Sequence, residues 1–375
     1  MRTDALREVA IVLRQYPLRV TGVASRERGY LVQTPQATGW LQAWRKRSRL
    51  KNFLTVYHVL MHRNSPFPLP LVRTKQRQWA VITSRRAYTL CRWPEQAEPL
   101  AAPQTPEEYA RWGELLGRLH RELQEARMSD GQTHAGSRHE ADLTGHAFEA
   151  WLQKMRTRRQ KVLEVRKEWQ EVPGLPEEER LFLRNVPQMM ERIDTAIWIL
   201  EDLKHRPVPS VCVWTLGELA DSFLLLSSGE VKLAPWKSFL PGNGLSDLGR
   251  LLLSAWDSPE LERAVRSAVG GYERQIPLTA EGFQALLAYV MFPHALWSLL
   301  QQADQNQALP SERLASGLDA PAKRLPADLD TLRNIYRTEQ RLRPVYAWLN
   351  RQIAERRAKI PLQKRPLKDA EKRID

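Results

Sequence analysis

The sequence has little cysteine and no long apolar run near its start. Cys91 and Cys212 are its two cysteines, and neither has a second Cys or a His at metal-ligand spacing. We therefore expect buried thiols, with no disulfide framework and no zinc site. Residues 1–20 carry charges at regular spacing, so we expect neither a signal peptide nor a membrane span. These absences predict a protein that stays in the cytoplasm.

Acidic residues are outnumbered by basic ones. The chain has 57 Lys and Arg against 43 Asp and Glu, a net charge of +14. Such an excess favours polyanions and acidic surfaces as partners, and much of it falls in residues 154–167 and 351–373. Solvated helix faces would explain the same pattern. No nucleic-acid-binding motif accompanies the charge, so we do not expect specific nucleic-acid binding.

The histidine-rich stretch around residues 131–146 gives no sign of a metal site. His134, His139 and His146 have no Cys or carboxylate at ligand spacing. Structural zinc sites need four such ligands, and catalytic sites need three. We expect no metal here.

Chain length and hydrophobic periodicity predict two lobes. The 375 residues are more than one core usually holds. Residues 3–16 and 48–62 have helical periodicity. Short apolar runs that are typical of strands lie between these helices and after the second one. The predicted strands are 18–24, 29–34, 39–44, 78–83 and 88–93. We expect an antiparallel-sheet lobe in residues 1–92.

The rest of the chain is mainly helical in pattern. The predicted helices are 107–124, a helical hairpin at 147–204, and then 259–272, 279–302 and 329–356. Pro293 should kink the helix at 279–302. We expect a helical lobe over residues 93–350, followed by a basic and disordered tail at 351–375. The fold class is α+β.

The stretch at residues 211–248 departs from this helical pattern. It reads as strand, turn, short helix, hairpin and loop, and then Asp247-Leu248 opens a helix. This order resembles the catalytic and metal-binding loops of the aminoglycoside phosphotransferase and choline kinase superfamily, the small-molecule relatives of protein kinases. The helix ending Leu-Gly-Arg-Leu-His at His120 also resembles that superfamily. The resemblance implies a bilobal protein-kinase-like fold.

The residues that carry phosphoryl transfer in the superfamily are replaced here. Its His-Gly-Asp begins at Thr215 and puts Gly217 where the catalytic Asp stands. The metal-binding Asn and Asp fall on Ser222 and Pro235, and the phosphate-binding Lys falls on Gln42. The Glu partner of that Lys is also missing, because residues 48–62 contain no acidic residue.

Two residues of the pattern are kept in type. By resemblance, Asp247 follows the metal loop and braces the catalytic loop. His120 takes a packing role in the helix that precedes it, and we expect a buried or capping histidine rather than a catalytic one. Asp247 is thus kept, although the residues that it orients in the superfamily are replaced. The resemblance therefore implies a protein that has kept the fold and lost phosphoryl-transfer activity.

The run Tyr-Val-Met-Phe-Pro-His at residues 289–294 resembles CotS-type spore coat proteins, which are kinase-like proteins of endospore-forming bacteria. This resemblance implies a structural or interaction protein of the spore coat, a pseudokinase whose partners are other coat proteins or an acidic surface. It would be made in the mother cell cytoplasm and move to the coat. We expect no cofactor under this interpretation.

Two alternatives remain open. The chain could be an ATP- and Mg²⁺-dependent small-molecule phosphotransferase that uses displaced acids, for which Glu218, Asp221 and Glu230 are the candidates. Acidic residues near a helix start also serve as caps, which gives Glu218 and Asp221 an ordinary explanation. Alternatively, the chain could be a basic protein that binds a polyanion.

Overall fold

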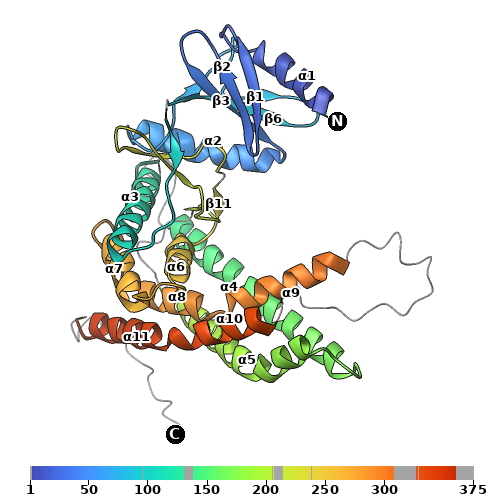
Figure 1. Ribbon diagram of the computed structural model, residues 1–375. Coiled ribbons are helices and arrows are strands. Elements are labelled where there is room, and N and C mark those ends of the chain that lie inside the picture. The colour runs from blue at the N-terminus through green and yellow to red at the C-terminus, as the bar shows by residue number, and fades with distance from the viewer. Residues whose placement is uncertain are drawn as a thin grey trace.

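The computed structural model describes residues 2–94, 96–130, 138–204, 206, 214–237, 239–307, 327 and 329–359. An antiparallel sheet occupies one end of the molecule and a stack of helices occupies the other (Figure 1). The α+β prediction, with an N-terminal antiparallel sheet and a mainly helical C-terminal region in a kinase-like arrangement, is confirmed.

The N-terminal sheet is built from short strands, and the strands at Thr38–Trp44 and Ala87–Trp93 are buried along most of their length. Its strands are β1 (Gly22–Arg26), β2 (Gly29–Gln33), β3 (Thr38–Trp44), β4 (Leu71–Val72), β5 (Val81–Ile82) and β6 (Ala87–Trp93). The order is β1-β2-β3-β6-β4, with β5 also on β6, and every pair is antiparallel. Because side chains alternate along a strand, each strand serves two faces.

The two faces of the sheet are covered by different elements. Helix α1 (Arg2–Leu13) packs on one face, where Val12 meets Leu41 and Leu90 in one buried cluster. Helix α2 (Arg47–His62) packs against the other face near Trp44. Trp40, Gln42 and Trp44 share the face opposite Leu41, so β3 directs Gln42 toward the rest of the molecule.

Short strands join the sheet to the helical region. Strand β7 (Glu98–Pro99) pairs with β9 (Phe223–Leu225), which in turn pairs with β10 (Val231–Leu233). Strand β8 (Trp214–Thr215) pairs with β11 (Leu240–Pro241). These pairings hold the 214–241 loops between the two ends of the molecule.

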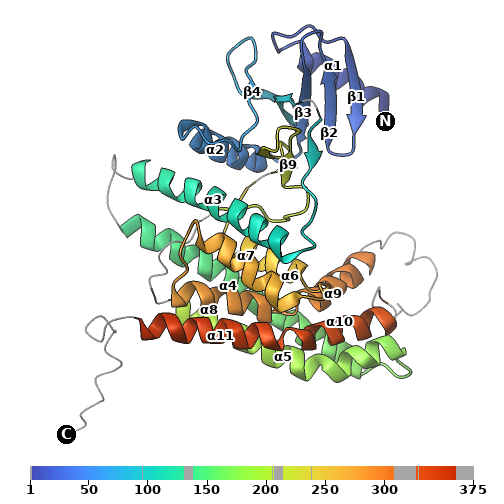
Figure 2. The ribbon, with the colours of Figure 1, turned by 60° about the vertical axis from the view of Figure 1, so that its left-hand side comes forward.

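The helical region is a layered stack (Figure 2). Its helices are α3 (Pro106–Asp130), α4 (Arg138–Gln170), α5 (Glu177–Lys204), α6 (Leu245–Ser254), α7 (Leu261–Glu273), α8 (Ala280–Met291), α9 (His294–Gln307), α10 (Leu329–Arg341) and α11 (Arg343–Ala358). Glycines bring α3 and α7 into close contact: a Cβ on Gly113 would overlap the Ala268 carbonyl, and one on Gly271 would overlap that of Ala110. Only glycine fits there.

Several predicted boundaries are wrong. The helix predicted at 279–302 is two helices, because Pro293 stands between α8 and α9, and the one predicted at 329–356 divides at Leu342. The tail predicted from residue 351 is helical to Ala358 in α11, since Val345, Leu349 and Ile353 bury one face of it. The loop predicted to residue 144 gives way to α4 at Arg138. The strand residues predicted at 211–213, Cys212 and the tail beyond 359 lie outside the described residues.

Within the described ranges, no single helix is both long and apolar enough to cross a membrane. Helix α8 together with residues 294–303 meets the criteria of length and composition only as a pair bent by 45°.

Candidate functional site

Asp247 fixes the loop that carries the catalytic positions. It lies in the first turn of α6 and is fully buried. Its Oδ2 accepts a hydrogen bond from the Leu216 backbone N–H at 2.7 Å, and its Oδ1 accepts one from the Thr215 hydroxyl. Arg250 donates to Oδ1 at 2.7 Å from one turn further along α6. A buried carboxylate needs such partners, and here they hold residues 215–216 in place.

His120 completes this network from α3. It is 1% exposed, with Nε2 3.3 Å from Asp247 Oδ2 and Nδ1 3.1 Å from the Tyr272 hydroxyl. A carboxylate oxygen accepts, so Nε2–H donates to Asp247, and Nδ1 lies within hydrogen-bond distance of the Tyr272 hydroxyl. The histidine therefore links α3, α6 and α7 from within the core and does not face an open surface.

Gln42 and Gly217 lie in the same surface hollow, whose volume is about 570 Å³. Gln42 is buried at the centre of β3, where its Oε1 accepts from Trp40 Nε1 at 3.2 Å and its Nε2 donates to the Ala43 carbonyl at 3.0 Å. Gly217 has φ +78°, a conformation that favours glycine over any residue with a side chain. The loop is thus adapted to having no side chain at the catalytic position.

The Ser222 side chain is buried and hydrogen-bonded within the protein. It is fully buried, and its hydroxyl donates to the Glu218 carbonyl at 2.7 Å. Its own carbonyl accepts from the Ala234 N–H at 2.9 Å. Ser222 therefore stabilises the turn between Glu218 and the hairpin, and it is not among the residues that line the hollow.

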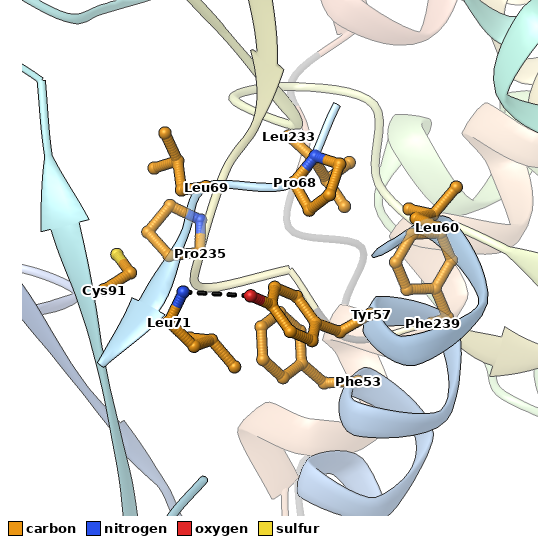
Figure 3. Close-up of a pocket in the computed structure, with 10 residues that line it drawn as sticks. All are labelled: Phe53, Tyr57, Leu60, Pro68, Leu69, Leu71, Cys91, Leu233, Pro235 and Phe239. Atoms are coloured by element: carbon orange, nitrogen blue, oxygen red, sulfur yellow. Dashed lines mark hydrogen bonds between the residues drawn. The ribbon is translucent and has the colours of Figure 1, made fainter. Parts of the chain in front are cut away.

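Pro235 faces an apolar pocket instead of the hollow. Figure 3 shows its ring among Leu69, Cys91 and Leu233, with Phe53 and Tyr57 of α2 nearby. The Tyr57 hydroxyl accepts a hydrogen bond from the Leu71 N–H at 3.0 Å, which the same view marks. Burial also raises the pKa of the Cys91 thiol to about 12. No charged side chain is among the described residues that line this pocket, so Pro235 packs as part of the core.

Helix α2 is fixed by a different contact from the one that the superfamily uses. Asn52 donates through Nδ2 to the Phe239 carbonyl at 3.0 Å, which ties α2 to the loop before β11. Arg47–His62 contains no acidic residue to pair with β3. The position of α2 is thus set by packing, by this amide and by the Tyr57 hydroxyl, which accepts from the Leu71 N–H.

Three tryptophans cover the end of β6. The ring centroids of Trp40 and Trp93 are 5.0 Å apart, and those of Trp40 and Trp236 are also 5.0 Å apart. Trp40 is 6% exposed and packs with Leu224 from β9. The indoles occupy the space between the sheet and the 223–236 hairpin.

The three acidic residues that could replace the missing carboxylates, Glu218, Asp221 and Glu230, make different contacts. Asp221, in the left-handed region at φ +52°, forms an ion pair with Arg28 of the β1–β2 turn, with Oδ2 2.6 Å from Arg28 Nη2. Glu230 forms an ion pair with Lys232 at 3.1 Å and is not among the residues that line the hollow. Glu218 is the one candidate acid that lines the hollow. Within the described residues, no group of three His, Cys, Asp or Glu side chains is placed to hold a metal.

Sequence reasoning missed the cations of the hollow. Arg28, Arg49, Lys237 and Arg250 line it together with Glu218. They come from the β1–β2 turn, α2, the loop after β10 and α6, so no motif or spacing in the chain connects them. Only the fold brings them together.

We compared the chain with known proteins on this geometry. No sequence-family model matches the chain, and no curated protein matches it in sequence. Among solved structures, an aminoglycoside phosphotransferase from Alicyclobacillus acidocaldarius superposes with a TM-score of 0.69 at 13% identity, covering 92% of this chain and 96% of that one. The fold is that of an aminoglycoside phosphotransferase.

A second similar structure is a spectinomycin phosphotransferase, described in complex with ADP and spectinomycin. Its TM-score is 0.53 at 10% identity, with 90% of this chain and 94% of that one covered. The AMP-bound form of the same enzyme gives 0.55 at 9% identity and covers 95% of this chain and 98% of that one. At such identities the likeness establishes the shared architecture alone.

Proposed function

We propose that this chain is a pseudokinase that acts as a structural or interaction protein, and that its place of action is the endospore coat. The observation that carries the first part is the state of the four catalytic positions. Gln42 is engaged by its neighbours, Gly217 has no side chain, Ser222 is buried in a turn, and Pro235 lies in an apolar pocket. None of these offers a charged oxygen to Mg²⁺, which gives up its waters reluctantly.

A turnover assay tests the loss of activity. The full chain would be incubated with Mg-ATP and with spectinomycin, other aminoglycosides or choline, and ADP release would be followed. We expect no more ADP than from the Glu218→Ala/Asp221→Ala double variant. Turnover that disappears in this variant would show that displaced acids have rebuilt the site, and the chain would then be an active small-molecule kinase.

The coat assignment rests on the run Tyr289 to His294, which has a plain structural role as well. The imidazole Nε2–H of His294 donates to the Tyr289 carbonyl at 2.9 Å, across the break that Pro293 makes. In a spore-forming host, the tagged protein should appear in the mother cell and then in purified coats. Its presence in vegetative cells and absence from coats would contradict the assignment.

We propose that the basic segments contact an acidic partner. Some of their cations already pair with acids of the same chain, so the unpaired ones are the residues to test. In α4, Arg156 pairs with Glu201 and Arg159 with Asp194 of α5, so these cations serve the helical hairpin itself. Lys167 in α4 and Arg351 in α11 are exposed and make no such contact within the described residues. We expect Lys167→Glu/Arg351→Glu to reduce recruitment to coats without unfolding the protein. Unchanged recruitment would contradict a role for these residues.

A further inference from the structure

The hollow of about 570 Å³ has retained a charge pattern suited to an anion, although the groups that hold Mg²⁺ are replaced. Four cations line it, and Glu218 is the one acid among the lining residues. In the superfamily a metal ion compensates the phosphate charge at this place. Here side chains from separate elements supply positive charge directly.

Lys237 is the central group of this site. It is 8% exposed, and its Nζ donates to the Glu218 carbonyl at 2.7 Å. An ammonium has three hydrogens to donate, and this bond uses one. Burial, the largest influence, lowers the pKa of Lys237, which is what incomplete compensation of a buried charge produces. A bound anion would supply the missing compensation.

The other cations differ in how far they are already neutralised. Arg250 forms an ion pair with Asp247 and Arg28 with Asp221. The Arg49 side chain is exposed and makes neither a hydrogen bond nor an ion pair within the described residues. Lys237 and Arg49 are thus the two cations of the hollow that pair with no carboxylate in the described part of the chain.

The neighbouring region restricts what the rest of the ligand can be. Trp40, Trp93 and Trp236 pack together between the sheet and the 223–236 hairpin, and Trp236 also lines the hollow. A ligand group that needed the space of this cluster would have to displace the buried Trp40 indole. The cations of the hollow therefore favour the phosphate part of a molecule, and indoles already fill the space beside them.

We propose that the hollow binds a small molecule bearing a phosphate or diphosphate group, without Mg²⁺ and without recognition of a nucleobase, through Lys237 and Arg49. This goes beyond the proposed function, because a protein without phosphoryl transfer can still bind a phosphorylated ligand. Charge-assisted hydrogen bonds from two cations to one phosphate supply the affinity.

The test is titration calorimetry of the full chain with inorganic pyrophosphate and, separately, with ADP, both in EDTA. We expect pyrophosphate to bind, ADP to bind with an affinity within about threefold of it, and both to weaken as NaCl is raised. The Lys237→Met variant should lose about tenfold or more in affinity, as expected for one charged contact. Absence of pyrophosphate binding at millimolar concentration, or binding that needs Mg²⁺, would overturn the proposal.

Three further variants keep the test decisive if Lys237→Met folds poorly. Arg49→Met should weaken pyrophosphate binding, whereas Lys51→Met should not, because Lys51 lies on the same helix with the same charge and does not line the hollow. Glu218→Gln should strengthen binding, since it removes the one carboxylate that repels the anion. Equal effects of Arg49→Met and Lys51→Met would show a general surface potential and no site. A loss of binding in Glu218→Gln would also contradict the proposal.

These outcomes are separable from those of the proposed function. Mg²⁺-dependent turnover would refute the pseudokinase and leave metal-free pyrophosphate binding to be judged by its own result. Failure of pyrophosphate to bind would refute the site and leave the loss of catalysis standing.

Discussion

At the scale of single residues, Asp247 and His120 support the loop that contains Gly217. Asp247 accepts from the Leu216 N–H and the Thr215 hydroxyl, and His120 supports it from α3. The next residue of the loop is Gly217, which brings no functional group. This network joins α3, α6 and α7 to β8.

His294 gives a prediction at this scale. It is half-buried beside Arg158 and Arg250, and desolvation of the imidazole lowers its pKa to about 3 from an ordinary value of 6.5. Between these values the unfolded chain binds a proton that the folded chain does not, so stability rises with pH there and falls as the pH is lowered.

The contribution of this one histidine has an upper limit of about 1.4 kcal/mol per pH unit. We expect the free energy of unfolding of His294→Gln to decline less than that of the wild type between pH 6.5 and 4. Urea denaturation at several pH values measures both. Parallel pH dependences in the two proteins would show that His294 is not kept neutral by the fold.

At the scale of elements, the contact between α3 and α7 depends on where its glycines stand. Gly270 and Gly271 are neighbours in α7, but a Cβ on Gly271 meets the Ala110 carbonyl, whereas one on Gly270 meets nothing within 4 Å. The two positions form a matched pair within one helix.

We expect Gly271→Ala to destabilise the protein by about 1–3 kcal/mol through overpacking. Gly270→Ala should stabilise it by about 0.5–1 kcal/mol, because alanine is the better helix former. Thermal or urea unfolding of both variants checks the signs. Equal effects would mean that the helices are further apart than described.

The ion pair between α4 and α5 gives a second prediction at this scale. Arg159 and Asp194 are partly exposed, so their net contribution should be at most about 1 kcal/mol. Arg159→Asp should cost stability, and adding Asp194→Arg should restore most of that cost. A double-mutant cycle measures the coupling, and the absence of coupling would show that the pair contributes nothing.

Helices and strands could be predicted from the sequence where the hydrophobic periodicity is strong and local. The helix at residues 107–124 and the strands around Gly22, Gly29 and Thr38 follow from hydrophobic periodicity. Breaks were less predictable: Pro293 reads as a kink in sequence, but it ends one helix because His294 caps the break through the Tyr289 carbonyl. The strand β7 has no pattern of its own and forms only because β9 lies beside it.

At the scale of the whole molecule, the resemblance identified two residues of the hollow, Gln42 and Gly217, but not the four cations that line it. Of the four positions aligned with the superfamily's polar residues, Gln42 and Gly217 share the hollow, whereas Ser222 and Pro235 are buried and do not line it. The four cations come from four elements far apart in sequence, and their convergence is a property of tertiary structure. Residue spacing cannot encode it.

We propose that the hollow binds phosphate groups without a metal, and the effect of Mg²⁺ on stabilisation by ATP tests this proposal. A ligand at 100-fold its dissociation constant stabilises the folded state by roughly 2.7 kcal/mol, which shifts the melting temperature by several degrees. The full chain would be melted with millimolar ATP in EDTA and again with excess Mg²⁺.

In a metal-dependent kinase, Mg²⁺ increases the shift. Here Mg²⁺ would compete with Lys237 and Arg49 for the phosphate oxygens, so we predict a shift with Mg²⁺ that is equal to or smaller than the shift in EDTA. A clear Mg²⁺-dependent increase in melting temperature would contradict the account.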